Sequence, residues 1–420
     1  MISINEIEFA RQRIAGNVLL TPCAYSEKLS LLTGCELYLK LENLQKTGSF
    51  KDRGALNRIL SLSDEERAAG IVAASAGNHA QGIAHAARVC GLKCVIVMPE
   101  TTPLSKVSGA RELGAEIVLH GAGYDDAFEE TSRLQLQKGY TLVHAFDDAG
   151  VIAGQGTIGL ELLEQVPEMD AVIVPVGGGG LISGIATAIK ARRPDVEVIG
   201  VESEHLPAMQ KSIAAGKLEQ VAMASTIADG IAVRKVGHLT MPIVRKLVSR
   251  VVTVSEEETA AAIMLLLERE KTLAEGAGAV GLAALYYDRL SDLRGRKVVV
   301  VISGGNIDME LLSRIVRRGL EHDGRLCELS VIVPDKPGSI ARVAAVIAAQ
   351  GSNIFELSQR RRESEVALGE RAVVLQLETR GHAHIATIVE ALGKEGIRLL
   401  NAEEDLSCLL YTSPSPRDTN

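Results

Sequence analysis

Lys51, at the expected start of a helix, is the residue in this sequence best suited to nucleophilic chemistry. It follows a run over 37–42 in which apolar and polar residues alternate, as in a strand, and then a short polar loop. Ser49 and Asp52 fit a capping box, so we expect Ser49 to cap the helix and Lys51 to lie in its first turn. Amide dipoles at a helix start disfavour a cation and lower the pKa of a nearby amine. Such an amine can form a Schiff base with an aldehyde, although many lysines in this position simply point into solvent.

Four consecutive glycines form a second candidate site. Gly177, Gly178, Gly179 and Gly180 follow a continuous apolar run and precede Leu181 and an expected helix. Successive backbone N–H groups in such a turn can converge on an anion, and the helix start adds its dipole, so a phosphate is the expected ligand. The spacing fits neither the dinucleotide fingerprint nor a nucleotide P-loop. The alternative is a tight turn with no ligand.

Two further polar segments follow strand-like runs. The segment 75–80 opens a helix whose start can hold a carboxylate, and Asn78 within it can donate a hydrogen bond to a phenolate oxygen. His79 is either a ligand-binding residue or a histidine that is satisfied within the fold. Ser303 ends a valine-rich strand, and its hydroxyl can either contact a pyridine nitrogen or form an ordinary turn. An amine, a phosphate cup and donors to a phenolate and a pyridine together describe pyridoxal phosphate.

The elements that position these residues alternate along the chain. Continuous apolar strands separated by helices predict parallel sheets covered on both faces, with ligands at the carboxyl ends of the strands. The expected strands are 37–42, 72–75, 94–98, 117–120, 142–143, 171–175, 197–202 and 297–302. The expected helices are 79–89, 103–113, 124–137, 156–165 and 182–192, after an N-terminal helix capped by Ser3.

The pattern changes after about residue 325. The next segments read as β-α-β-β-α-β, a ferredoxin-like unit. We therefore predict an α/β catalytic region over 1–319, with a small subdomain at about 46–141 inserted in a large one. A linker at 320–326, a ferredoxin-like domain at 327–402 and a disordered or foreign tail at 403–420 complete the chain.

Composition excludes several functional classes. The 420 residues carry a net charge of −8, which gives no basic footprint, so we expect neither nucleic acid nor an anionic membrane as a partner. It contains no apolar run of the roughly 18 residues that a membrane span needs, and no signal peptide is visible at its start. Six scattered cysteines favour a reducing compartment, so we expect a cytoplasmic protein. Cys90 and Cys94 lack further ligands nearby, and we predict no metal site.

The chain resembles the fold-type-II pyridoxal phosphate enzymes, and most closely the threonine dehydratases (threonine ammonia-lyases), from about residue 6 to 319. The segments that carry the resemblance are 48–55, 75–82, 177–180, 226–230, 274–279 and 303–306. The resemblance implies that Lys51 binds the cofactor covalently and later removes the substrate's Cα proton. It also implies a set of binding residues: Phe50 beside the ring, Asn78 at the phenolate, Gly177 to Leu181 at the phosphate, Ser303 at the pyridine nitrogen, and Ser75, Asn78 and His79 at the substrate carboxylate.

Two departures separate this chain from the similar serine racemases. Racemases have serine where Ala76 stands, and alanine has no proton to deliver to the second face of Cα, so we expect elimination without appreciable racemisation. Racemases also place carboxylates around the end of the strand that here closes with Glu202, where this chain has Leu206 and Ala208. One carboxylate cannot complete the oxygen shell of a divalent ion, so we expect no tightly bound Mg²⁺ or Ca²⁺.

Residues 327–402 resemble an ACT domain, an amino-acid-sensing module in which an effector usually binds near the loop 334–339. The resemblance therefore implies an enzyme that converts L-threonine to 2-oxobutanoate and ammonia, and L-serine to pyruvate, under regulation by an amino acid such as isoleucine or valine. It also favours a homodimer or homotetramer. The alternatives are a β-replacement synthase similar to cysteine synthases, a serine racemase-like enzyme, and a non-enzymatic amino-acid sensor.

Overall fold

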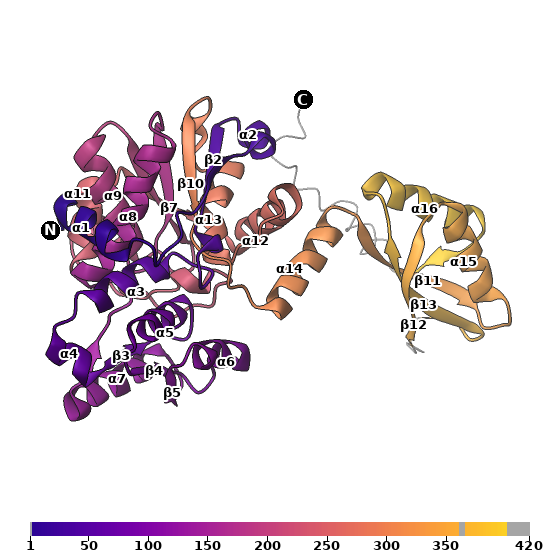
Figure 1. The fold of residues 1–420 in the computed structure, drawn as a ribbon. Helices are drawn as coiled ribbons and strands as arrows, with labels where there is room; N and C mark the ends of the chain where they lie inside the picture. Colours follow the sequence, from indigo (N-terminus) through magenta and orange to yellow (C-terminus); the bar gives the residue numbers. More distant parts are fainter. Residues whose placement is uncertain (1, 361–365, 401–420) are drawn as a thin grey trace. The chain divides into compact units, whose positions relative to one another are not determined.

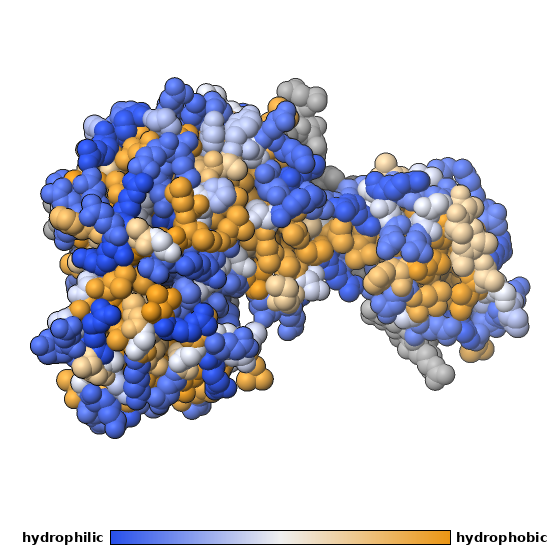
Figure 2. Space-filling model, in the orientation of Figure 1, coloured by the Kyte–Doolittle hydropathy of each residue, from blue (hydrophilic) through white to orange (hydrophobic). Residues whose placement is uncertain are grey.

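The computed structural model describes residues 2–360 and 366–400, and the chain divides into two compact units (Figure 1). The first unit is Met1–Asp308 and the second is Met309–Asn420. The tail expected at 403–420 lies outside the described residues. In the part of the chain that the structure covers, none of the helices is both long enough and apolar enough to cross a bilayer. Figure 2 shows hydrophilic side chains over much of the visible face of each unit, with smaller apolar areas among them.

A six-stranded sheet forms the centre of the first unit. Its strand order is β1-β2-β10-β7-β8-β9, and every pair is parallel except β1 with β2. Every residue of β7 is buried, so helices cover both faces of the sheet, as the continuous apolar runs predicted. The strands are β1 Cys23–Tyr25, β2 Glu36–Leu41, β7 Ala171–Pro175, β8 Glu197–Ser203, β9 Arg250–Val254 and β10 Lys297–Ile302. The longer helices of this part are α1 Ile4–Ile14, α8 Ala149–Gln165, α9 Gly180–Arg192, α12 Glu256–Leu265 and α13 Gly276–Tyr286, with the shorter α2 Glu27–Thr33, α10 Ala208–Ala215 and α11 Thr240–Leu247.

A second, smaller parallel sheet lies in the same unit, with the order β5-β4-β3-β6. Its strands are β3 Ile71–Ala74, β4 Cys94–Met98, β5 Glu116–Leu119 and β6 Thr141–Leu142. Its helices are α3 Lys51–Leu60, α4 Asp64–Ala69, α5 Asn78–Cys90, α6 Leu104–Glu112 and α7 Tyr124–Lys138. Each sheet has its own core of buried aliphatic side chains.

One helix is longer than the sequence pattern predicted. The expected helix at 156–165 begins at Ala149, because the Asp148 side chain caps it by accepting a hydrogen bond from the Val151 N–H at 2.9 Å. Glycines in the first two turns of this helix interrupt the apolar periodicity from which a helix is predicted. One of them, Gly154, is required by close packing, since a Cβ there would lie 2.5 Å from the carbonyl oxygen of Arg53 in α3. Helix α3 therefore lies directly against α8.

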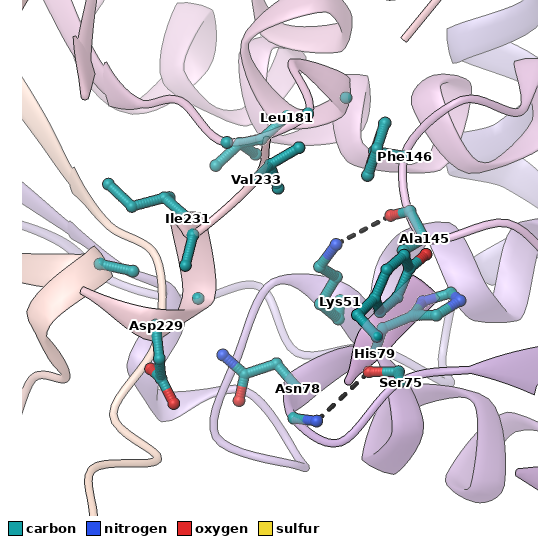
Figure 3. Close-up of a pocket in the computed structure, with 18 of the residues that line it drawn as sticks. Lys51, Ser75, Asn78, His79, Ala145, Phe146, Leu181, Asp229, Ile231 and Val233 are labelled. Carbon is teal, nitrogen blue, oxygen red and sulfur yellow. Dashed lines mark hydrogen bonds between the residues drawn. The ribbon is translucent and has the colours of Figure 1, made fainter. Parts of the chain in front are cut away.

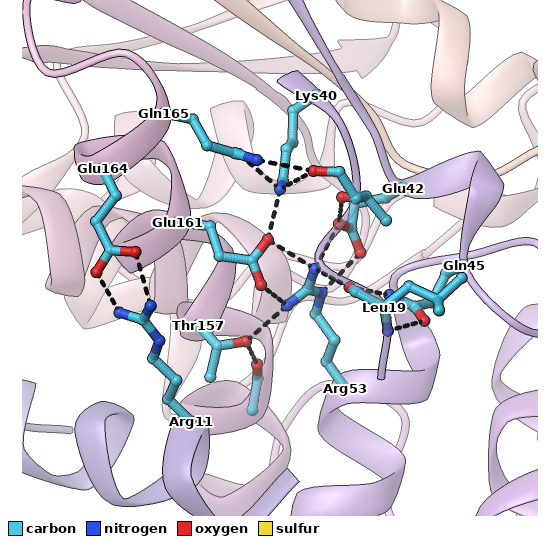
Figure 4. A network of polar contacts seen from close by, with 12 residues as sticks. Arg11, Leu19, Lys40, Glu42, Gln45, Arg53, Thr157, Glu161, Glu164 and Gln165 are labelled. Carbon is cyan, nitrogen blue, oxygen red and sulfur yellow. Dashed lines mark hydrogen bonds and ion pairs between the residues drawn. The ribbon is translucent and has the colours of Figure 1, made fainter. Parts of the chain in front are cut away.

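A buried group of four charges fixes the same two helices to the large sheet (Figure 4). The Arg53 guanidinium of α3 forms two hydrogen bonds with Glu42, both 2.8 Å long, and two with Glu161 of α8. Lys40 of β2 also donates to Glu161, and to the carbonyl oxygen of Thr21 at 2.8 Å. Two cations thus meet two carboxylates, and all four side chains are less than a tenth exposed. The group has no net charge, which makes its burial tolerable.

The second unit contains a four-stranded antiparallel sheet with the order β12-β13-β11-β14. Helices α15 and α16 pack on it over a core of buried aliphatic residues, in the β-α-β-β-α-β order that the sequence predicted. Its elements are α14 Met309–His322, β11 Leu326–Pro334, α15 Ser339–Ala349, β12 Asn353–Arg360, β13 Glu370–Glu378, α16 His382–Lys394 and β14 Arg398–Leu399.

We expect the buried charges to control the stability of the first unit. Glu161→Gln should lower the free energy of unfolding by about 3–5 kcal/mol, because it leaves Arg53 and Lys40 buried without full compensation. Glu164→Gln is the matched control on the same helix. Its side chain is 57% exposed and pairs with Arg11 at the surface, so the loss should stay below about 1 kcal/mol. Urea unfolding measures both values, and equal losses would contradict a special role for the buried group.

Candidate active site

The carboxyl ends of β3, β7 and β10 face one cavity of about 780 Å³ between the two sheets of the first unit. Every site residue predicted from the sequence lines it, although these residues come from four distant parts of the chain. Figure 3 shows Lys51, Ser75, Asn78, His79 and Leu181 around this space. The cavity-lining residues predicted from the sequence are Phe50, Lys51, Ser75, Asn78, His79, Gly177, Gly178, Gly179, Gly180, Leu181 and Ser303.

Lys51 is the first residue of α3, as expected, but the predicted capping box is wrong. Phe50 occupies the capping position, and no side chain caps the helix. The Asp52 carboxylate instead accepts hydrogen bonds from the backbone N–H and the hydroxyl of Thr47, at 2.8 and 2.7 Å. This arrangement turns the preceding loop toward the end of β10, where the Phe50 N–H donates to the carbonyl oxygen of Ser303 at 3.0 Å. The backbone therefore places Lys51 beside Ser303.

The environment of Lys51 favours a neutral amine. Burial lowers the pKa of Lys51 to about 8, against a raising effect of the Glu275 carboxylate. The amine donates a hydrogen bond to the carbonyl oxygen of Ala145 at 2.8 Å (Figure 3) and lies 5.2 Å from the centre of the Phe50 ring. A substantial fraction of such an amine is unprotonated at neutral to mildly alkaline pH, so it can act as a nucleophile and as a base.

The tetraglycine segment forms the turn between β7 and α9. Gly179 has a left-handed φ of 92°, and α9 begins at Gly180. At Gly178 a Cβ would lie 2.2 Å from the ring of Phe146, so no other residue fits there without displacing that ring. The backbone N–H groups at the start of α9 have no partner within the helix, and Gly180 and Leu181 line the cavity, so these groups are available to an anion there.

The loop after β3 presents a second helix start, that of α5. The Ser75 hydroxyl accepts a hydrogen bond from the Gly77 N–H at 3.2 Å (Figure 3), and α5 begins at Asn78. Burial lowers the pKa of His79 to about 3, so its ring is neutral. Its Nε2 lies 3.0 Å from the carbonyl oxygen of Val143 and must carry the proton, which leaves Nδ1 as an acceptor without a partner. The first N–H groups of α5 are therefore the donors available to a carboxylate in this part of the cavity.

Sequence reasoning missed three contributors to the site. Glu275 is buried in the cavity wall, accepts a hydrogen bond from the Asn78 amide at 2.6 Å, and has its pKa raised to about 7 by burial. Phe146 packs over the glycine turn. Asp147 accepts from the backbone N–H groups of His238 and Leu239 and so fixes the loop beside that turn. A single charged residue within the small-residue run 274–279 was the one available sequence signal for Glu275.

Two ion pairs join the small and large parts of the unit at the cavity. Lys106 of α6 donates to Asp229 at 2.5 Å, and Arg234 donates to Asp125 of α7 at 2.9 Å. All four residues line the cavity, and neither pair was anticipated because each joins segments more than 100 residues apart.

Comparison with known proteins agrees with this geometry. Residues 14–304 match the family described as pyridoxal-phosphate dependent enzyme, and residues 328–396 match the ACT domain. The chain belongs to the pyridoxal-phosphate dependent enzymes. It is 48% identical over 396 residues to the L-threonine ammonia-lyase of Thermotoga maritima, covering 94% of this chain and 98% of that protein. The L-threonine dehydratase catabolic TdcB of Escherichia coli K12 is 44% identical over 315 residues, which cover 75% of this chain and 96% of that protein.

Two solved structures extend the comparison. Maize serine racemase is 38% identical, with a TM-score of 0.72, and the match covers 76% of this chain and 98% of that one. Threonine deaminase isoform 2 from Solanum lycopersicum is 36% identical, with a TM-score of 0.71, over 75% of this chain and 86% of that one. The fold-type-II core and the ferredoxin-like ACT domain expected from the sequence are thus confirmed.

The residues of the cavity fit pyridoxal phosphate. A buried amine of lowered pKa suits its aldehyde, and the glycine turn that a Cβ would obstruct suits its phosphate. Ser303, which is 2% exposed, and Asn78 add polar groups to the same cavity for the two polar atoms of the ring. The site therefore offers a group of suitable chemistry to each functional part of the cofactor.

We expect the rate at which cofactor-free enzyme forms its imine with pyridoxal phosphate to reveal the lowered pKa of Lys51. Only the neutral amine reacts, so the rate should rise with pH and level off above about 8. Stopped-flow absorbance between pH 6.5 and 10 measures it. Nα-acetyl-lysine is the control, because its ordinary amine should keep accelerating over the whole range. A plateau shared by enzyme and control, or none below pH 10, would contradict the assignment.

Proposed function

We propose that this enzyme is an L-threonine ammonia-lyase, which converts L-threonine to 2-oxobutanoate and ammonia and L-serine, more slowly, to pyruvate. The observation that carries the proposal is the buried amine of Lys51 facing a glycine-lined anion site, in a chain that matches an L-threonine ammonia-lyase over 94% of its length. Serine lacks one methyl group, and a missing methyl in a pocket is worth only about 1–3 kcal/mol, so both substrates should react.

The roles of the binding residues follow from their positions. The N–H groups from Gly177 to Leu181 bind the cofactor phosphate, and the Ser303 hydroxyl donates to the pyridine nitrogen. Asn78 donates to the phenolate oxygen, while Phe50 packs beside the ring. The helix start at Ser75, Asn78 and His79 binds the substrate carboxylate, with His79 contributing its backbone N–H because its ring N–H already faces Val143.

Lys51 is the catalytic residue. Its amine, whose pKa is lowered by burial, would hold the cofactor through the aldehyde and would serve as the base for the proton on the substrate's Cα. When bound, pyridoxal phosphate supplies an electron sink that stabilises the negative charge left on Cα. The phosphate group that the glycine turn would hold could supply the proton for the hydroxyl that leaves Cβ. The Ser303 hydroxyl would leave the pyridine nitrogen uncharged, which would favour this expulsion over transamination.

The serine racemase-like alternative is less well supported, although racemases are among the similar structures. Ala76 lines the cavity where a second proton donor would be needed, and its methyl group has no proton to give. Glu202 accepts hydrogen bonds from the backbone N–H groups of Met209 and Gln210, at 2.7 and 2.9 Å, and so caps helix α10. The absence of a divalent ion at Glu202 remains a prediction.

The second unit supports a regulatory role. We propose the functional division already expected from the sequence: a catalytic region over 1–319 with a small subdomain at about 46–141, a linker at 320–326 and the ACT domain at 327–402. The ACT family match supports feedback by isoleucine or valine, bound near the loop 334–339. We also propose a cytoplasmic enzyme that works in isoleucine biosynthesis as a homodimer or homotetramer.

Product analysis tests the proposed reaction. We expect L-threonine alone to yield 2-oxobutanoate and ammonia in equal amounts, with no need for an added thiol and with no D-allo-threonine, the product of inversion at Cα. L-serine should yield pyruvate more slowly, without D-serine. Keto-acid detection and chiral chromatography measure these products. A requirement for a second nucleophilic substrate would instead establish the β-replacement synthase, and D-serine as the main product would establish the racemase.

Regulation is tested by titrating isoleucine and valine against threonine turnover. We expect at least one of them to change the substrate concentration needed for half-maximal rate in the whole chain. A chain ending near Gly324 should lose that response but keep its turnover, because 315 residues of this chain match 96% of a relative that is named an L-threonine dehydratase. Identical kinetics of the whole chain and the shortened chain at every effector concentration would contradict the proposed regulation.

A further inference from the structure

We propose that Asn306 is a positioning residue: it fixes the side-chain amide of Asn78 so that the amide nitrogen, and not the oxygen, faces the cofactor. The inference rests on the proposed contact between Asn78 and the phenolate oxygen. It adds a residue to which no role has been assigned so far, and it explains how an amide that could bind in two orientations is held in one.

A chain of hydrogen bonds runs behind Asn78. The Nδ2 atom of Asn306 donates to the carbonyl oxygen of Thr47 at 2.8 Å and to Oδ1 of Asn78 at 2.7 Å. The Nδ2 atom of Asn78 then donates to Oε1 of Glu275 at 2.6 Å. Asn78, Glu275 and Asn306 all line the cavity, and Figure 3 shows Asn78 and Lys51 pointing into the same space.

Which atoms donate and which accept in this chain of hydrogen bonds follows from the chemistry of the groups alone. The backbone carbonyl of Thr47 can only accept, so the atom of Asn306 that contacts it must be the nitrogen. That nitrogen uses its second hydrogen for Asn78, and the contacted atom of Asn78 must therefore be the oxygen. The nitrogen of Asn78 is left facing the Glu275 carboxylate, which again accepts when ionised. The Thr47 end of this hydrogen-bond chain thus fixes the orientation of both amides, and the ionised form of Glu275 requires the same orientation.

The Asn78 amide keeps one donor after these contacts. Its nitrogen carries two hydrogens, and only one points to Glu275. The other is available to the phenolate oxygen of a bound cofactor. The reversed amide would place its carbonyl oxygen against that phenolate, so two acceptors would face each other and the hydrogen bond to a charged atom would be lost.

The three side chains of this hydrogen-bond chain, Asn78, Glu275 and Asn306, are packed too closely to rearrange easily. A Cβ at Gly304 would lie 2.5 Å from Oε1 of Glu275 and 3.1 Å from Nδ2 of Asn78. A Cβ at Gly48 would lie 2.6 Å from Oδ1 of Asn306. Both glycines belong to the segments that carry the family resemblance, and their lack of a side chain leaves room for the three polar residues.

Asn306→Asp is the direct test, because a carboxylate has nearly the same shape but cannot donate to Thr47 or to Asn78. The full-length variant should bind pyridoxal phosphate roughly tenfold or more weakly. It should also show altered visible circular dichroism of the bound cofactor, which reports the setting of the ring. Asn306→Ala removes the donor without adding charge. It should also weaken cofactor binding and alter the dichroism, and it replaces the first variant if that variant folds poorly.

Asn43→Asp is the matched control. Asn43 is also largely buried, and its amide donates to two acceptors, the Thr272 hydroxyl and the Leu273 carbonyl oxygen, at 2.8 and 2.9 Å. It is not among the residues that line the cavity. This variant should lose stability through the same chemical change, yet keep the affinity and the dichroism of the wild-type enzyme. A loss of cofactor affinity in this control equal to that of Asn306→Asp would overturn the inference.

A double-mutant cycle decides whether Asn306 acts through Asn78. In an Asn78→Ala background, Asn306→Asp should cause no further loss of cofactor affinity. Full additivity of the two losses, or unchanged affinity and dichroism in Asn306→Asp, would overturn the inference while leaving the proposed function intact. Failure of the wild-type protein to bind pyridoxal phosphate would be a different result, because it would refute the proposed function itself.

Discussion

The pairing of Arg53 with two buried carboxylates is the interaction on which the site depends. Arg53 follows Lys51 by two residues on α3, and its guanidinium contacts Glu42 at the end of β2 and Glu161 on α8. The contacts hold the start of α3 at one angle to the large sheet, and the close approach at Gly154 prevents the helix from moving toward α8. A reactive amine can be aimed at a cofactor only from a rigid support of this kind.

The elements expected from the sequence have the right order and type, because buried parallel strands are continuous apolar runs and helices have their own period. No element was predicted between residues 203 and 296, where β9 and helices α10 to α13 lie. β10 was predicted with its true bounds, Lys297–Ile302. The capping of α3 was not, because Asp52 bonds to Thr47 within a loop that pairs with the end of β10 through Ser49 and Gly304. Such tertiary contacts override a local motif. The start of α8 was missed because its glycines serve helix packing, a demand that periodicity does not record.

The sequence predicted which residues form the site, but not the hydrogen bonds that connect them. Each of the loops after β3, β7 and β10 carries a recognisable motif, and the carboxyl ends of parallel strands bring them together. Glu275 and Asn306 lie within sequence motifs, but the sequence predicted no role for either side chain. Their importance comes from distances of 2.6 and 2.7 Å to one side chain, Asn78, that lies more than 190 residues away in the sequence.

The cavity is built from loops that lie far apart along the chain and meet only when both sheets of the first unit have formed. No part of the unfolded polypeptide can therefore reproduce the cofactor site. Binding that is confined to the native state shifts the folding equilibrium by mass action. A pyridoxal phosphate bound in this cavity would therefore stabilise the folded first unit, and its loss would leave that unit easier to unfold.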